Sequence, residues 1–326
     1  MKRLLYGLGI ALVIFAGIYF GIAWYFSTQI IVLDAAPVDE GVAASPNEGS
    51  DEDYSDEARW RPPFDFPKED ISFEVNDITL AGWYYDNPAD GNCGVVLLHG
   101  FTGDKGFVGL YAPMFYDLGC DILAYDSRGH GDSETAFVTW GYYERAEAAA
   151  AVEWLSLRMT LPTNQIGVLG MSYGASTALQ MLFVQPDVAF VVVDSPFQDM
   201  ETIIKQQSVS IFGDAIRLVT PGAFQVSEWR AGIEVDETSA LKAVQNVDTP
   251  ILIFHSTDDT FVYPSNSEAI YAVANPDTTR LILQEYGSSH TEAILTNETE
   301  MRQQVYAFIE EFAPDFGSRE MIVQGN

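Results

Sequence analysis

The chain has 326 residues, of which 48% are hydrophobic. This is enough material for one large α/β domain or two small ones, and it excludes a small peptide scaffold. The chain carries 47 acidic against 16 basic residues, a formal net charge of -31. Because such a surface repels nucleic acid and anionic lipid headgroups, we expect neither a nucleic acid nor another polyanion as a partner.

The first expected element is an N-terminal transmembrane helix at Leu4–Phe26. These 23 positions carry no formal charge, and at about 1.5 Å per residue they span roughly 34 Å, enough to cross a bilayer. Lys2 and Arg3 precede the segment and no basic residue follows before Arg59. The positive-inside rule therefore places residues 1–3 in the cytoplasm and the remainder of a single-pass membrane protein outside it. A cleaved signal peptide is the alternative, although the apolar core exceeds the usual ~7–15 residues.

Residues 27–63 turn polar and acidic, and they are rich in Asp, Glu, Pro, Ala and Ser, with almost no periodic apolar pattern after Leu33. We interpret them as a flexible stalk. Repulsion among its carboxylates is expected to keep the stalk extended and to lift the globular domain, residues 64–326, off the membrane.

Within the globular part, short β-branched runs alternate with amphipathic segments of helix length, which predicts a mostly parallel sheet with helices on both faces. Eight strands are expected, at Ile71–Val75, Thr79–Tyr85, Val95–His99, Ile122–Asp126, Ile166–Gly170, Val188–Asp194, Ile251–Ser256 and Arg280–Tyr286. Crossover helices are expected at Phe107–Gly119, Tyr142–Met159, Ser172–Val184, Ser265–Ala274 and about Glu292–Phe312. The stretch at about residues 198–248 interrupts this alternation. We interpret it as a small helical cap over the site, because so long an insertion is usually functional.

The two cysteines, Cys93 and Cys120, each stand two residues before an expected strand. If these strands are parallel neighbours, the two thiols lie at the same edge of the sheet. A domain outside the cytoplasm permits a disulfide there, but buried free thiols are also common. The sequence leaves this choice open.

The motif Gly170-Met171-Ser172-Tyr173-Gly174 places a serine between two glycines where a strand ends and a helix begins. In so tight a turn, side chains at Gly170 and Gly174 would collide with the neighbouring strand and helix, and Ser172 is forced into a strained conformation that projects its Oγ. An ordinary strand-to-helix turn can match G-x-S-x-G by chance. The flanking strand and helix favour a nucleophile elbow with Ser172 as the nucleophile.

A serine hydroxyl needs a base within hydrogen-bond reach and an acidic residue that orients this base. Of the four histidines, only His290 lies in a small-residue loop between the last expected strand and the last expected helix. His290 is therefore the expected base. For His99 and His130 we expect loop-locking hydrogen bonds, and for His255 a satisfied contact in the core.

The expected acid is Asp259, which follows a strand and so lies at the same sheet edge as the elbow. Asp258 beside it and Asp194 at the end of the preceding strand are the alternatives. The order Ser172, Asp259, His290 is the order in which a nucleophile on such an elbow, its acid and its base are expected to follow along the chain.

A tetrahedral oxyanion needs two preorganised donors, and loss of one typically costs about 10²–10³ in rate. The backbone N–H of Tyr173 is one expected donor, since it follows the nucleophile. The second is the backbone N–H of Phe101, in the loop after the strand Val95–His99. The side chains of Phe101 and Tyr173 are expected to line the acyl pocket and bind substrate.

Taken together, these motifs resemble the α/β-hydrolase superfamily, in its serine-aminopeptidase-like or prolyl-oligopeptidase-like branch, including membrane-anchored members with one span. The resemblance covers about Ile71 to Phe312. It rests on HGFTG at His99–Gly103, DSRGHGDS at Asp126–Ser133, GMSYG at Gly170–Gly174, HSTDDTFV at His255–Val262 and GSSH at Gly287–His290. Such families place the acid three residues before a Val, which matches Asp259 and Val262, while Ser256 stands where Gly is usual.

The resemblance implies an α/β-hydrolase fold and a serine hydrolase that cleaves an ester, thioester or amide through an acyl-enzyme, without a metal or organic cofactor. We expect a small-molecule or acyl substrate. A carboxylesterase acting on uncharged acyl groups is favoured, because the negative field disfavours anionic substrates. The same fold hosts peptidases and acyltransferases, and these remain alternatives. A hydrolase-like domain that only binds a ligand is a further alternative.

Overall fold

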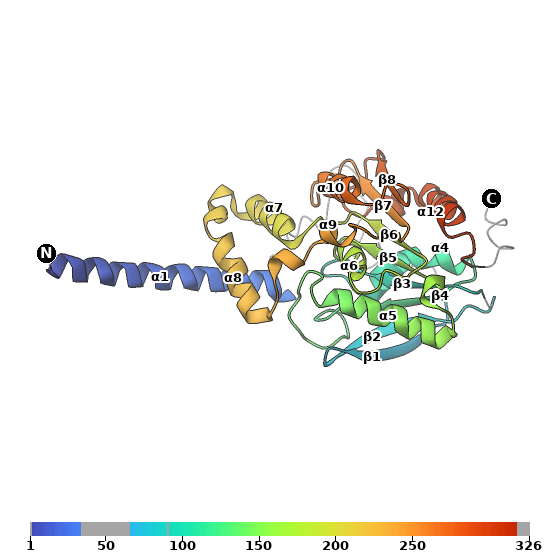
Figure 1. Ribbon diagram of the computed structural model, residues 1–326, viewed down its shortest axis with the longest axis horizontal. Coiled ribbons are helices and arrows are strands. Elements are labelled where there is room, and N and C mark those ends of the chain that lie inside the picture. The colour runs from blue at the N-terminus through green and yellow to red at the C-terminus, as the bar shows by residue number, and fades with distance from the viewer. Residues whose placement is uncertain (1, 34–65, 90, 318–326) are drawn as a thin grey trace, which may run out of the picture.

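The structure, a computed structural model, describes residues 2–33, 66–89 and 91–317 of the chain (Figure 1). Its core is an eight-stranded sheet in the order β1-β2-β4-β3-β5-β6-β7-β8. The strands are β1 (Glu69–Val75), β2 (Ile78–Tyr85), β3 (Gly94–Leu98), β4 (Asp121–Tyr125), β5 (Ile166–Met171), β6 (Phe190–Asp194), β7 (Ile251–Ser256) and β8 (Thr279–Gln284). β2 is antiparallel to both of its neighbours, and all other neighbouring strands are parallel. The expected mostly parallel sheet is confirmed.

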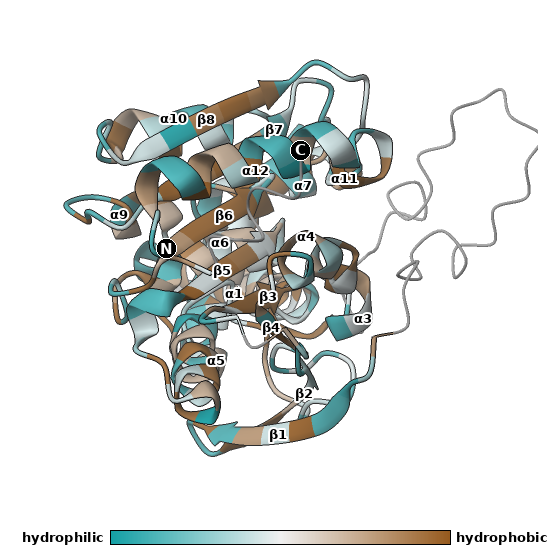
Figure 2. Ribbon diagram, turned by 90° about the vertical axis from the view of Figure 1, so that its right-hand side faces the viewer, coloured by the Kyte–Doolittle hydropathy of each residue, from teal (hydrophilic) through white to brown (hydrophobic). Residues whose placement is uncertain are grey.

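Strands β3 to β7 are buried along their whole length, as parallel strands covered on both faces must be. One face packs against α5 (Glu144–Met159), α6 (Tyr173–Met181), α9 (Ala240–Ala243) and α10 (Ser265–Val273). The other face packs against α3 (Lys105–Val108), the 3-10 helix η2 (Gly109–Tyr111), α4 (Ala112–Tyr116), α11 (Ala293–Thr296) and α12 (Glu298–Phe312). Figure 2 shows β6 hydrophobic along most of its length.

Two of the expected crossover helices are interrupted. The segment expected as one helix at Phe107–Gly119 consists of α3, η2 and α4, and Pro113 lies in the first turn of α4. Proline has no N–H to donate, so it starts a helix more readily than it continues one. The last expected helix divides into α11 and α12 at Asn297, whose backbone leaves the helical region (φ -142, ψ 41).

The insertion expected at about residues 198–248 is a helical cap. It contains α7 (Met200–Phe212), the 3-10 helix η4 (Asp214–Leu218), α8 (Thr220–Ala231), the 3-10 helix η5 (Val235–Glu237) and α9. Gly213 and Gly232 follow α7 and α8 with φ values of 73 and 68. Glycine adopts this left-handed region without steric cost, so both positions end a helix sharply.

The N-terminal helix α1 (Lys2–Ile31) is longer than expected and contacts the cap, lying beside α8 in Figure 1. It is long and apolar enough to cross a membrane. A signal sequence near the N-terminus meets the same criteria of length and composition. Ser27 and Ile31 are fully buried. The expectation that a flexible stalk begins at Ser27 is therefore wrong for residues 27–31, which belong to α1. Residues 34–63 of the expected stalk lie outside the described residues.

Cys93 and Cys120 form a disulfide. They precede β3 and β4, which are parallel neighbours in the sheet. The choice that the sequence left open is therefore resolved in favour of the bridge.

Candidate active site

Ser172 occupies the tight turn between β5 and α6. Its backbone has φ 52 and ψ -113, a conformation that residues other than glycine rarely adopt. Its N–H donates to the carbonyl oxygen of Asp194 over 2.8 Å, which ties the turn to β6. A Cβ at Gly170 would lie 2.3 Å from the carbonyl oxygen of Gly174, and one at Gly174 would lie 2.3 Å from that of Leu98. Both positions therefore require glycine, as the motif predicts.

The three residues predicted as nucleophile, base and acid lie in one hydrogen-bonded chain. His290 Nε2 is 2.7 Å from Ser172 Oγ, and His290 Nδ1 is 2.6 Å from Asp259 Oδ2. The side chains come from the loops after β5, β7 and β8, whose carboxyl ends share one edge of the sheet. Asp259 is 2% exposed and Ser172 is 8% exposed, so both residues are buried.

The environment of Asp259 keeps it ionised. Its Oδ1 accepts hydrogen bonds from the N–H groups of Phe261 and Val262, both at 2.9 Å. Burial acts to raise the pKa of Asp259, but the adjacent His290 and a hydrogen bond from His255 hold it well below its usual value. The carboxylate is therefore an anion that can orient a protonated imidazole.

The two alternative acids have other surroundings. Asp258 is exposed. Asp194 is buried and accepts hydrogen bonds from the hydroxyls of Tyr111 at 2.7 Å and Ser195 at 2.9 Å. The geometry thus favours Asp259 as the partner of the imidazole.

His255, which the sequence assigned to a core contact, also lies beside the acid. Its ring is fully buried. Its Nδ1 is 2.6 Å from Ser267 Oγ, and its Nε2 is 2.7 Å from the carbonyl oxygen of Val262 and 3.3 Å from Asp259 Oδ2. The only signal in the sequence was its position four residues before Asp259, and in a strand followed by a loop this spacing does not fix a contact.

The loop after β3 approaches the elbow closely. A Cβ at Gly100 would lie 3.6 Å from the Cβ of Ser172. Lys105, further along the chain, holds this loop against the loop after β4. Its backbone N–H and its Nζ donate to Asp126 over 2.7 Å and 2.6 Å, respectively. Its Nζ also donates to Asp132 over 2.7 Å. These contacts fix the backbone around Phe101 next to the nucleophile.

The side chains of Phe101 and Tyr173 differ in accessibility. Phe101 is half-buried and stacks on Trp140 with ring centroids 5.0 Å apart. Tyr173 is fully buried, and its hydroxyl donates to Glu144 Oε1 over 2.7 Å. The lining roles expected of Phe101 and Tyr173 both remain predictions.

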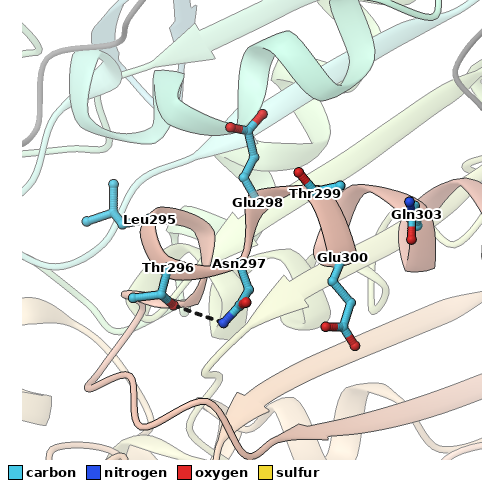
Figure 3. Close-up of a pocket in the computed structure, with 7 residues that line it drawn as sticks. All are labelled: Leu295, Thr296, Asn297, Glu298, Thr299, Glu300 and Gln303. Atoms are coloured by element: carbon cyan, nitrogen blue, oxygen red, sulfur yellow. Dashed lines mark hydrogen bonds between the residues drawn. The ribbon is translucent and has the colours of Figure 1, made fainter.

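A surface depression lies elsewhere, where α11 meets α12 (Figure 3). It is lined mostly by polar side chains, namely Leu295, Thr296, Asn297, Glu298, Thr299, Glu300 and Gln303. None of the predicted site residues lines it, and Glu298 forms an ion pair with Arg302. Across residues 2–33, 66–89 and 91–317, no group of three or more His, Cys, Asp or Glu side chains is arranged to hold a metal ion.

The sheet order and the turn after β5 are those of an α/β hydrolase, and solved structures of this class share the fold. The sequence pattern of the Prolyl oligopeptidase family matches residues 108–315. The chain belongs to this family, and it is accordingly a hydrolase.

Several proteins are similar to this chain over most of its length. The uncharacterised protein YqkD of Bacillus subtilis is 26% identical over 273 residues, which cover 83% of this chain and 86% of YqkD. The esterase Pf2001 of Pyrococcus furiosus superposes with a TM-score of 0.60 at 23% identity, over 76% of this chain and 93% of the esterase. The acylaminoacyl peptidase of Pyrococcus horikoshii superposes with a TM-score of 0.58 at 17% identity, over 76% of this chain and 41% of the peptidase. At such identities the structural likeness shows the fold alone.

Proposed function

We propose that this hydrolase is a serine hydrolase with Ser172 as nucleophile, His290 as general base and Asp259 as the orienting acid. The observation that carries the proposal is the chain of hydrogen bonds from Ser172 Oγ through His290 to Asp259, at 2.7 and 2.6 Å. An imidazole so placed takes the proton of a hydroxyl that is otherwise a poor nucleophile at neutral pH.

In the proposed reaction, Ser172 Oγ attacks the substrate carbonyl carbon while its proton passes to His290 Nε2. The tetrahedral intermediate collapses, the bond to the leaving alcohol breaks, and the alcohol leaves with the proton from His290. A water molecule then repeats these steps on the acyl-enzyme and releases the carboxylic acid. Asp259 remains ionised throughout and stabilises the imidazolium.

The proposed oxyanion donors are the backbone N–H groups of Tyr173 and Phe101. Tyr173 opens α6, so its N–H lies next to the nucleophile at the positive end of a helix. Phe101 follows Gly100, whose close approach to Ser172 brings this backbone to the reacting centre. Two donors in these places would stabilise the charge that develops on the carbonyl oxygen.

The proposed substrate is a carboxylic ester with an uncharged acyl group. Aromatic rings surround the site: Phe101 stacks on Trp140, and the Phe261 ring lies 5.0 Å from that of His290. The net charge of -31 disfavours anionic substrates. The name of the family and the likeness to an acylaminoacyl peptidase favour a peptidase as the second candidate.

Turnover by the full-length protein in detergent separates these candidates. We expect hydrolysis of a short acyl p-nitrophenyl ester and little release of p-nitroaniline from an N-acetylaminoacyl anilide. Equal turnover of both would favour the peptidase. Acyl transfer to an added alcohol in preference to water would indicate an acyltransferase.

Two neighbouring carboxylates provide a matched pair of variants. Asp259→Asn keeps the side-chain shape but removes the charge that stabilises the imidazolium, so kcat should fall about 10⁴-fold. Asp258→Asn changes an exposed carboxylate and should retain activity. Equal activity of the two variants in ester turnover would show that Asp259 is not the acid.

We also propose that α1 anchors the chain as a single membrane span, with the N-terminus in the cytoplasm and the catalytic domain outside. The support is the length and composition of α1 and the basic residues Lys2 and Arg3 before its apolar part. We expect the protein to stay with membranes after alkaline carbonate extraction, with residues 2–33 intact by mass spectrometry. Removal of this segment would indicate a signal peptide.

A further inference from the structure

The cap exposes an apolar surface directly beside α1. We define the cap face as Ile211, Phe212, Leu218 and Trp229, which are 40%, 44%, 79% and 70% exposed. These residues belong to α7, η4 and α8, and Figure 1 shows α7 and α8 at the end of the molecule from which α1 projects. Phe212, Leu218 and Trp229 each contact α1 between Tyr19 and Phe26. Large exposed apolar side chains around one segment mark a surface that contacts a partner.

The cap face is continuous with the surface of α1. The Tyr19 hydroxyl donates to the carbonyl oxygen of Leu218 over 3.2 Å. The ring centroids of Trp24 and Trp229 lie 6.0 Å apart. Gly222 allows close packing, because a Cβ there would lie 2.7 Å from the Tyr19 hydroxyl oxygen. Any medium that surrounds this part of α1 therefore also reaches the cap face.

The free part of α1 is too short to cross a bilayer by itself. Between the charged Arg3 and the first contact with the cap at Tyr19, the uncharged residues are Leu4–Ile18, 15 positions. At about 1.5 Å per residue these span about 22 Å, whereas a hydrocarbon core is about 30 Å thick. A bilayer crossed by α1 must therefore extend about five residues further, to about Ala23, which is the part of α1 that Leu218 contacts.

The charge distribution of the cap also fits lipid. Although the chain has a net charge of -31, the stretch from Gln206 to Ser227 contains only two charged residues, Asp214 and Arg217. They form an ion pair at 3.0 Å. A locally neutral, apolar segment suits the interface of a bilayer, and the exposed Trp229 follows this segment, between Glu228 and Arg230.

We propose that the cap face inserts into the leaflet from which α1 emerges, so that the hydrolase domain sits on a neutral lipid surface. This inference rests on the proposed membrane span and is independent of the proposed chemistry. It also places the site near lipid: the Trp140 indole N–H donates to the carbonyl oxygen of Ile30 in α1 over 2.9 Å, and Trp140 stacks on Phe101.

Fluorescence quenching tests the inference on the full-length protein. Since both native cysteines are bridged, a Leu218→Cys variant can carry one environment-sensitive fluorophore in phosphatidylcholine vesicles. The matched control is Leu157→Cys near the C-terminal end of α5, which is similarly exposed at 72%. Figure 1 shows α5 within the hydrolase domain and not beside the projecting part of α1. We expect spin-labelled phosphatidylcholine to quench most of the emission at position 218 and aqueous iodide to quench little of it. The control should show the reverse.

Other outcomes overturn the proposal. If iodide quenches both positions alike, the cap face lies in water; if neither quencher reaches position 218, a second protein copy covers it. A chain that does not float with vesicles has no such lipid partner. Trp229→Cys repeats the test from α8, so the result does not depend on the folding of one variant. A Ser172→Ala background should leave the pattern unchanged, which separates this proposal from the hydrolytic one.

Discussion

The four histidines differ in the partners of their ring nitrogens. His99 uses both nitrogens within the loops: Nε2 accepts from the N–H of Ser127 at 2.9 Å, and Nδ1 lies 2.7 Å from the carbonyl oxygen of Gly100. This ring must be neutral, with its proton on Nδ1. His290 instead faces Ser172 in the turn after β5, whereas the serine beside His255 is Ser267, which is fully buried.

The neutrality of His99 makes stability depend on pH. Burial, and then the charge of His130, lower the pKa of His99 from 6.5 to about 4. The unfolded chain therefore binds this proton at a higher pH than the folded protein, so stability is fully present above pH 6.5 and is lost as the pH falls from 6.5 to about 4. At about pH 5, the titration of His99 alone should lower the free energy of unfolding by about 2 kcal/mol.

Thermal melts of the wild type and of His99→Gln in the same detergent measure this effect. The variant should melt lower than the wild type near neutral pH, because it loses the hydrogen bond from Ser127. It should also lose less stability on acidification, since the titrating group is gone. Parallel curves would show that other groups carry the pH dependence.

For single residues, the sequence predicts the nucleophile, the base and the acid better than it predicts the residues that support them. Ser172, Asp259 and His290 each follow a strand, so their chain positions predict that they meet at one sheet edge. The burial of Tyr173 depends on Glu144, an acid 29 residues earlier in the chain. The sequence pattern contains no information about such a contact.

Among the secondary structure elements, α1 departs most from expectation. Ile31 belongs to the apolar cluster of the cap together with Trp140 and Phe224, and its carbonyl oxygen accepts from the N–H of Val138 over 2.9 Å. The polar residues from Ser27 to Gln29 conceal this role, because they read as the start of a solvated linker. The strands were easier to predict, since buried β-branched runs mark them directly.

The end of α1 should therefore contribute to the stability of the globular domain. Ile31→Ala removes a fully buried side chain and should lower the free energy of unfolding by about 2–4 kcal/mol. Ile14→Ala, at a position 57% exposed on the same helix, is the matched control and should leave it unchanged in detergent. Equal denaturation midpoints for the two variants would contradict a structural role for this turn.

In the molecule as a whole, one covalent link joins the segments that lead into β3 and β4. The Cys93–Cys120 bridge spans a sequence separation of 27 residues. Closing a loop of this size restricts the unfolded chain, so replacing both cysteines by alanine should lower stability by about 3 kcal/mol. A reductant should lower the melting temperature of the wild type and leave that of the double variant unchanged. A reductant effect on both would point to another cause.

The central claim is that the structure holds an activated serine at position 172. The most direct measurement is labelling of the full-length protein in detergent with a fluorophosphonate, followed by peptide mapping by mass spectrometry. We predict one adduct on Ser172, retained in Asp258→Asn and strongly reduced in Asp259→Asn. A folded protein that stays unlabelled, or an adduct on another residue, would contradict the account.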